Sequence, residues 1–209
     1  MGNIDDNLRL LEEELQLRNY SPKTVAAYRS CLADFLRTVP GGIQQSNREQ
    51  IKQYLLTKQA RGAASQTINL HLNAIKFFYR DVLKFHTPLD LKFAKRSMKL
   101  PVVLTRNEIA RLLQATANAK HRLLLALTYG AGLRVSEIIS LKIRDLDLME
   151  LMLTVRGGKG QRDRLTILPE RLRDGLRNLM ADKEGAVWLF ASERGGKLSA
   201  RTAQVVFAR

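Results

Sequence analysis

Two cations at a fixed spacing are the side chains of this chain best suited to phosphate chemistry. Arg134 follows the turn Gly130-Ala131-Gly132, and Lys159 lies 25 residues later within Gly157-Gly158-Lys159-Gly160. An arginine offers a planar fork of donors that matches phosphate oxygens, and a lysine between glycines can bring an ammonium near a leaving oxygen. Phosphoryl transfer depends on positioning and charge neutralisation, so this pair predicts a phosphate site.

Other charged residues accompany the pair. Glu137 lies three residues after Arg134, and we expect it to orient that arginine, as supporting carboxylates do. The alternative is an ordinary ion pair between positions i and i+3 on a helix surface. Three arginines close to Lys159 in sequence are expected to bind neighbouring phosphates: Arg156, Arg162 and Arg164.

The second half of the chain supplies the elements that position these residues. Thr105 followed by Glu108 is a capping box that predicts a helix to about residue 117. Further helices are predicted over 120–129 and 133–141, with Arg134 in the first turn of the latter, where free N–H groups and the helix dipole favour an anion. Strands over 151–156 and 164–168 form a hairpin that carries Lys159 at its tip. A helix then starts at Pro169-Glu170, and Ser199 caps another.

The first 85 residues predict a compact four-helix domain without strands. The first predicted helix ends at about residue 18, and the second runs from Ser21-Pro22 to before Pro40. The third runs from Ser46 to Gly62, and the fourth from Ser65 to about Tyr79. Residues 86–104 form a basic linker, which is either a solvated connection or a strap across a phosphate backbone. Its cations are Lys92, Lys95, Arg96 and Lys99. Residues 105–209 form the second domain.

The net charge of +15 favours a polyanionic partner. Residues up to Arg96 include 15 basic and 9 acidic side chains, and the rest include 20 and 11, so the excess is spread along the chain. The alternative is a soluble basic protein without a nucleic-acid partner.

The single cysteine, Cys31, excludes an internal disulfide. The acidic N-terminus lacks an apolar leader and no apolar run has membrane-spanning length, so we expect a cytoplasmic protein.

These motifs together resemble the tyrosine recombinases, the Xer and phage-integrase family. The stretch from Tyr129 to Leu141 resembles the first box of that family, and residues 157–164 resemble its catalytic hairpin. Asn19-Tyr20-Ser21-Pro22-Lys23-Thr24-Val25 resembles the opening of its helical core-binding domain. The resemblance covers essentially the whole chain. It implies a mainly α fold with a small β-hairpin, in which a four-helix SAM-like domain precedes an α+β catalytic domain.

The family implies a clamp on double-stranded DNA that acts without metal or nucleotide cofactor. A tyrosine attacks the scissile phosphate and forms a 3′-phosphotyrosyl link, and the family works as a tetramer on two DNA sites. By resemblance, Arg134 is the first catalytic arginine, Lys159 is the general acid, and Glu137 is the supporting acid. The resemblance therefore predicts a homo-oligomer on DNA.

The chain departs from the family pattern toward its C-terminus. The family places a His-x-x-Arg box and the nucleophilic tyrosine there, whereas none of His71, His86 and His121 is followed by an arginine at the third position. We therefore expect a catalytic domain that is cut short and DNA binding without cleavage. Three hypotheses remain: a recombinase with part of its active site, a non-cleaving competitor or regulator at recombination sites, and a basic adaptor with no DNA role.

Overall fold

The computed structural model describes residues 3–39, 48–85, 90–95, 100, 102–157, 163–181 and 183–208. The chain divides into two compact units, Met1–Pro101 and Val102–Arg209. Four of the predicted site residues, Arg96, Lys99, Lys159 and Arg162, lie outside the described residues. The other six lie within them and can be placed.

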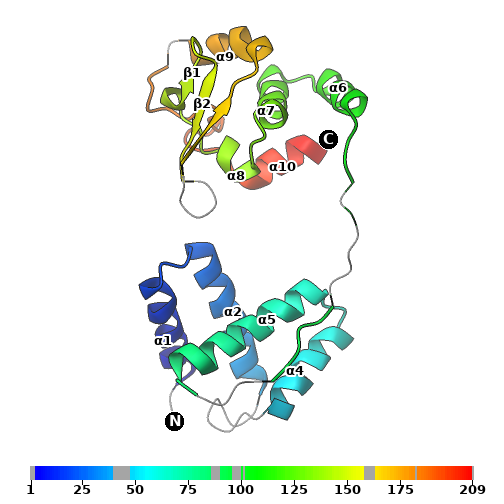
Figure 1. Cartoon of the computed structure of the whole chain (residues 1–209), viewed down its shortest axis with the longest axis vertical. Helices are drawn as coiled ribbons and strands as arrows, with labels where there is room; N and C mark the ends of the chain where they lie inside the picture. Colours follow the sequence, from blue (N-terminus) through cyan, green and yellow to red (C-terminus); the bar gives the residue numbers. More distant parts are fainter. Residues whose placement is uncertain are drawn as a thin grey trace. The chain divides into compact units, whose positions relative to one another are not determined.

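The described part of the first unit is helical (Figure 1). Its elements are α1 (Ile4–Leu17), α2 (Pro22–Thr38), α4 (Arg48–Ala60), α5 (Ser65–Phe77) and a π-helical turn η1 (Phe78–Val82). Helix α5 lies across α2, and α1 packs beside α2. Ser46, the predicted start of the third helix, falls outside the described residues.

Local capping and apolar spacing explain these helices. The Ser21 hydroxyl accepts a hydrogen bond from the Thr24 backbone N–H at 3.2 Å, and Pro22 occupies the first helical position, where a missing N–H costs nothing. Leu8, Leu11 and Leu15 recur at helical spacing and are all buried. They join apolar residues of α2, α4 and α5 in one core, which holds the unit together by hydrophobic burial.

The second unit combines helices with a small sheet. Its α-helices are α6 (Arg106–Ala115), α7 (Ala119–Gly130), α8 (Val135–Ile138), α9 (Arg173–Met180) and α10 (Ala200–Ala208). Its 3₁₀ turns are η2 (Ile143–Asp145) and η3 (Glu170–Leu172), and its strands are β1 (Leu146–Asp147), β2 (Met152–Val155) and β3 (Arg164–Ile167). The predicted mainly α fold with a small sheet is confirmed.

The sheet is antiparallel with strand order β1-β2-β3. Strand β2 pairs with β3 so that Val155 faces Arg164, as the predicted hairpin requires. The two-residue strand β1 was not predicted, because so short a segment leaves no alternating pattern. Buried residues of β2, including Leu153 and Val155, join the core formed with α7 and α9.

The helix predicted over 133–141 is much shorter than expected: α8 covers only Val135–Ile138. The chain leaves the helix to pair with a distant segment: the Leu189 N–H donates to the Leu141 carbonyl at 2.9 Å, and Lys142 forms an antiparallel bridge with Trp188. These long-range bonds replace the helical bonds that the local sequence favours.

The capping motifs predicted in this unit are present. Glu108 Oε2 accepts a hydrogen bond from the Thr105 N–H at 2.7 Å, and the Thr105 hydroxyl accepts one from the Glu108 N–H at 3.3 Å. The Ser199 hydroxyl accepts one from the Thr202 N–H at 3.0 Å at the start of α10. Each motif satisfies N–H groups that a helix start leaves free, which fixes where the helix begins.

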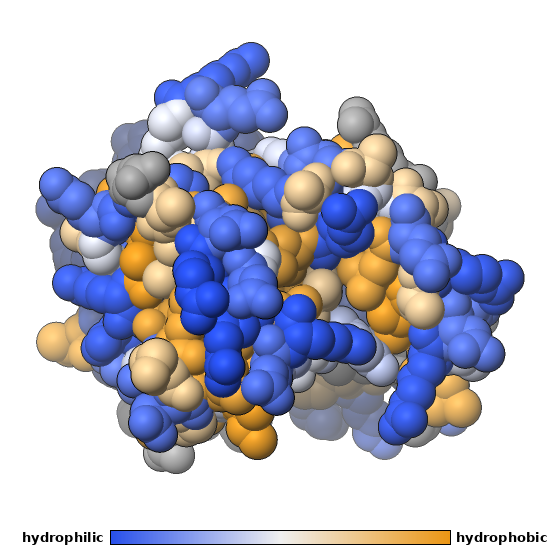
Figure 2. Space-filling model, turned by 90° about the horizontal axis from the view of Figure 1, so that it is seen from above, coloured by the Kyte–Doolittle hydropathy of each residue, from blue (hydrophilic) through white to orange (hydrophobic). Residues whose placement is uncertain are grey.

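Helices of the described residues are too short or too polar to cross a membrane. Figure 2 shows one face of the molecule on which hydrophilic side chains cover much of the surface, with smaller hydrophobic areas between them. This polar surface agrees with the content of charged residues, 26% of the chain, which is ordinary for a globular protein.

Candidate active site

A tight turn between α7 and α8 places Arg134. Helix α7 ends at Gly130, where a Cβ atom would lie 2.5 Å from the Pro169 ring and is therefore not tolerated. Gly132 has a φ of +62°, a conformation that glycine adopts without steric cost. The turn closes with a hydrogen bond from the Leu133 N–H to the Thr128 carbonyl at 2.9 Å. Arg134 therefore becomes the N-cap residue of α8.

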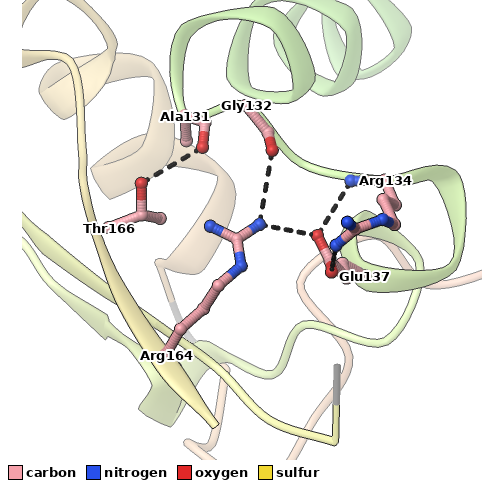
Figure 3. Close-up of polar contacts among 6 residues, drawn as sticks. All are labelled: Ala131, Gly132, Arg134, Glu137, Arg164 and Thr166. Carbon is pink, nitrogen blue, oxygen red and sulfur yellow. Dashed lines mark hydrogen bonds and ion pairs between the residues drawn. The ribbon is translucent and has the colours of Figure 1, made fainter. Parts of the chain in front are cut away.

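Glu137 is the centre of the site. Its side chain is only 4% exposed, and its two oxygens accept three hydrogen bonds. Oε1 accepts from Arg134 Nη1 at 2.8 Å, while Oε2 accepts from the Arg134 backbone N–H at 2.9 Å and from Arg164 Nη2 at 2.8 Å (Figure 3). Both arginines therefore share one carboxylate, which is not exposed as a surface ion pair would be.

The pKa of Glu137 lies below its ordinary value. Burial by itself raises this pKa, but hydrogen bonds from the Arg134 backbone and from the Arg134 and Arg164 side chains outweigh burial. The carboxylate is therefore ionised at neutral pH. An ionised acid accepts stronger hydrogen bonds from guanidinium groups than a neutral one does, so it can hold both arginines in place.

The Arg134 side chain is held at one point and is otherwise exposed. One guanidinium nitrogen is held by Glu137, while 60% of the side chain remains exposed. An exposed guanidinium whose orientation is fixed can bind a phosphate at little entropic cost. The expected contribution of the helix dipole is not supported, because α8 has only four residues and a dipole of that length is small.

Arg164 lies at the start of β3 and points toward the same turn. Its Nη2 donates to Glu137 Oε2 and also to the Gly132 carbonyl at 3.3 Å. Two residues along the strand, the Thr166 hydroxyl donates to the Ala131 carbonyl at 3.2 Å (Figure 3). Strand β3 is thus attached to the turn that carries Arg134. Arg164 was predicted as a DNA-binding residue, and its side chain is 37% exposed.

Arg156 is held at the base of the hairpin by a second buried acid. Its Nε donates to Asp145 Oδ1 at 2.8 Å, and the Asp145 side chain is 4% exposed. Asp163 closes the hairpin base by accepting from the Gly157 N–H at 2.8 Å. Arg156 remains 55% exposed, and its role in binding phosphates stays a prediction. Sequence reasoning missed Asp145, because nothing local distinguishes it from the nearby acids Asp147 and Glu150.

Lys92 and Lys95 lie on a segment that folds back on the first unit. The Asn69 side chain donates to the Ala94 carbonyl at 3.0 Å and accepts from the Ala94 N–H at 2.8 Å. Lys76 donates to the Leu91 carbonyl at 2.6 Å. Residues 90–95 are therefore held on α5, with Lys92 and Lys95 exposed. The role of these lysines in binding phosphates stays a prediction.

Among the residues that the structure describes, no group of three or more His, Cys, Asp and Glu side chains is arranged to hold a metal ion. Tyr54 and His71, which lie side by side in the first unit, are hydrogen-bonded to each other. The Tyr54 hydroxyl contacts His71 Nδ1 at 2.8 Å and also donates to Asp34. Burial and this bond to Asp34 raise the pKa of Tyr54, which makes its hydroxyl a poor nucleophile.

Family models cover both halves of the chain. The phage integrase family model matches residues 102–209, and the model of the phage integrase N-terminal SAM-like domain matches residues 8–88. The chain belongs to the phage integrase family. The predicted combination of a SAM-like domain with an integrase catalytic fold is thereby confirmed.

Curated relatives agree with this membership. The tyrosine recombinase XerA of Pyrococcus horikoshii is 32% identical over 203 residues, which cover 94% of this chain and 70% of the relative. The XerA of Thermococcus kodakarensis is 31% identical and covers 100% and 75%. Two Sinorhizobium fredii relatives with integrase/recombinase names are 31% and 33% identical, and the chain spans 61% of the length of each.

Solved structures share the fold at low sequence identity. A λ integrase tetramer bound to a Holliday junction matches with a TM-score of 0.79 and 20% identity, over 100% of this chain and 65% of that one. The Tn1549 transposon integrase in complex with circular intermediate DNA matches with a TM-score of 0.75 and 18% identity, over 97% and 76%.

Proposed function

We propose that this chain binds double-stranded DNA as the DNA-gripping part of a site-specific tyrosine recombinase. The observation that carries the proposal is Arg134, which is 60% exposed and is held by a buried carboxylate. Membership of the phage integrase family supports it, because the XerA relatives are named as tyrosine recombinases. The net charge of +15 supports a polyanionic partner.

The proposed chemistry assigns one role to each residue. Arg134 neutralises the charge that develops on the scissile phosphate, and Glu137 holds Arg134 in the orientation that this requires. Lys159 protonates the leaving 5′-oxygen, a role that rests on sequence resemblance alone. In the complete reaction a tyrosine attacks the phosphate and forms a 3′-phosphotyrosyl link as the bond from phosphorus to the 5′-oxygen breaks.

We propose that residues 1–209 by themselves bind DNA without cleaving it. Tyr54 has its hydroxyl engaged by Asp34 and His71, and no histidine of this sequence is followed by an arginine at the third position. The first domain, the basic segment 86–104 and the second domain are proposed to contact the duplex together. Assembly into an oligomer on DNA is proposed from the family and from the λ integrase tetramer and dimer among the structural neighbours.

Two measurements test this function. In a mobility-shift assay, affinity for duplex DNA should fall about 10³-fold when salt rises from about 50 to about 200 mM, because bound cations release counterions from DNA. A salt-independent affinity, or none, would favour the adaptor hypothesis. A nicked suicide substrate, which traps covalent intermediates, should give no protein–DNA adduct. An adduct that maps to one of the five tyrosines would overturn binding without cleavage.

The alternative is a non-cleaving competitor or regulator at recombination sites. It shares the DNA affinity, so it is separated by adding the chain to a reaction of a complete recombinase. A competitor lowers the recombination rate in proportion to the sites that it occupies. A chain that leaves the rate unchanged at saturating occupancy would exclude this alternative.

A further inference from the structure

Arg164 makes two contacts with a single nitrogen. Its Nη2 donates to Glu137 Oε2 at 2.8 Å and to the Gly132 carbonyl at 3.3 Å. The first contact reaches the acid that holds Arg134, and the second reaches the turn immediately before Arg134 (Figure 3). Both acceptors are internal, so this nitrogen is directed away from solvent and is not available to an external phosphate.

The charges of the cluster explain what Arg164 adds. Glu137 carries one negative charge, and its side chain is almost completely buried. With Arg134 as its only cationic partner, the pair would be neutral and would attract an anion weakly. With Arg164 in place, one carboxylate faces two guanidinium groups, and the cluster carries a net charge of +1. An anion that approaches the exposed end of Arg134 then meets a positive site.

The hydrogen bonds lead to the same conclusion. Arg164 occupies Glu137 Oε2 together with the Arg134 backbone N–H. Arg134 reaches the other oxygen, Oε1, through Nη1. Without Arg164, the Arg134 guanidinium could rotate to grip both oxygens in the bidentate manner that arginine and carboxylate prefer. Its donors would then be used internally instead of on a phosphate.

We propose that Arg164 is a positioning residue that keeps the Arg134 guanidinium free and correctly placed for phosphate by sharing the Glu137 carboxylate and fixing the turn at Gly132. This inference rests on the proposed DNA-binding function. It assigns Arg164 a role different from direct contact with DNA. A direct ligand would contribute to affinity independently of Arg134, whereas a positioning residue contributes through Arg134.

A double-mutant cycle measures this difference. Affinity for a fluorescently labelled DNA duplex is determined for the full chain with and without Arg134→Ala, in the wild-type and Arg164→Met backgrounds. In the wild-type background, Arg134→Ala should weaken binding about 10-fold, as expected for the loss of a charged hydrogen bond. In the Arg164→Met background the same change should weaken binding less than about 2-fold, because Arg134 is no longer available to phosphate.

Two further variants separate positioning from general stability. Arg164→Lys restores the positive charge and should recover part of the Arg134 effect. Thr166→Val removes a neighbouring hydrogen bond from the same strand to the same turn without touching Glu137, and it should leave the full Arg134 effect. If Arg164→Met fails to fold, as judged by circular dichroism, Arg164→Gln takes its place, because it removes the charge while keeping an N–H donor.

The outcomes are distinguishable. An equal Arg134→Ala effect in the wild-type and Arg164→Met (or Arg164→Gln) backgrounds would show that the two residues act independently, and it would overturn the positioning role while leaving DNA binding intact. Loss of the Arg134 effect in Thr166→Val as well would reduce Arg164 to a structural contact. If Arg134→Ala changes nothing in the wild type, the proposed role of Arg134 fails, and the role of Arg164 fails with it.

Discussion

Among the described residues, each unit contains a nearly buried acid between two arginines, and the two clusters differ in their charge balance. In the first unit, Asp81 Oδ1 contacts Arg18 at 2.9 Å and Oδ2 contacts Arg80 at 2.7 Å. In the second unit, Glu137 contacts Arg134 and Arg164, both at 2.8 Å. The side chains of Asp81 and Glu137 are 10% and 4% exposed.

The difference lies in a further carboxylate. Arg18 also contacts Glu14 at 2.7 Å, so the cluster around Asp81 contains two acids and two arginines and is neutral. The cluster around Glu137 has one acid for two arginines and keeps a net positive charge. The same combination of residue types therefore connects helices in one unit and presents a cation in the other. Charge balance, more than burial, separates a structural cluster from a candidate anion site.

The largest effect is expected from Glu137→Gln. This change keeps the shape but weakens the hydrogen bonds from both arginines, and it should lower the free energy of unfolding by about 2 kcal/mol, the scale of hydrogen bonds to a charged group. DNA affinity should fall as well, because Arg134 loses its support. Urea denaturation and mobility shift measure the two effects. A stable variant with unchanged DNA affinity would show that Glu137 does not support Arg134.

Arg134→Ala should separate binding from folding. Because the side chain is 60% exposed and Glu137 keeps its bond to Arg164, we expect a smaller loss of stability than from Glu137→Gln, but an affinity for DNA about 10-fold lower, from the loss of a charged contact. The matched variant is Arg80→Ala, which removes a 73% exposed arginine from the neutral cluster. It should change affinity less than about 2-fold. Equal losses in the two variants would contradict the importance of charge balance.

Asp81→Asn should act on stability alone. The loss of charge on one acid of the first cluster is expected to cost about 1 kcal/mol of unfolding free energy, less than at Glu137, because Asp81 is more exposed and its partner Arg80 is near the surface. DNA affinity should stay within about 2-fold of the wild type. A loss of affinity as large as that of Arg134→Ala would give the first cluster a role in binding.

The smallest effect is a difference in acid sensitivity. Burial raises the pKa of Asp81 and of Glu137, but hydrogen bonds from their arginines, and at Glu137 first from the Arg134 backbone, bring both below their ordinary values. As pH falls, the unfolded chain therefore binds more protons than the folded protein does. The stability from each group is present above its unfolded pKa and is lost as pH falls through its folded pKa. In thermal melts below about pH 5, the melting temperature of Glu137→Gln should fall less steeply with decreasing pH than that of the wild type.

Local patterns predicted many features of the fold correctly. Ser21-Pro22, the capping box at Thr105 and Glu108, and the Ser199 cap all mark helix starts, because a cap depends on residues three positions apart. The hairpin of β2 and β3 follows from apolar alternation on both sides of a glycine-rich stretch. The pairing of Arg134 with Glu137 was also predictable, since its two members lie within one helical turn.

The features that the sequence did not predict depend on distant residues. Helix α8 ends early because Leu141 and Lys142 pair with the segment around Trp188. Asp145, in η2, pairs with Arg156, the residue that follows β2. The expected contact of Arg164 with DNA stays a prediction, but the bond from one of its nitrogens to Glu137, 27 residues earlier in the chain, was not predicted. No local pattern encodes these contacts, because they form only when the core brings the strands against α7 and α8.

The sequence by itself determined which residues carry charge, where the helices begin, and that Arg134 has an acid within reach. Only the tertiary structure decided that this acid is buried, that Arg164 shares it, and that the exposed end of Arg134 belongs to a cluster of net positive charge. The physical reason is that burial and charge balance are properties of a neighbourhood in space. The neighbours of Glu137 come from the turn after α7, from α8 and from β3, which are joined only by the packing of the second core.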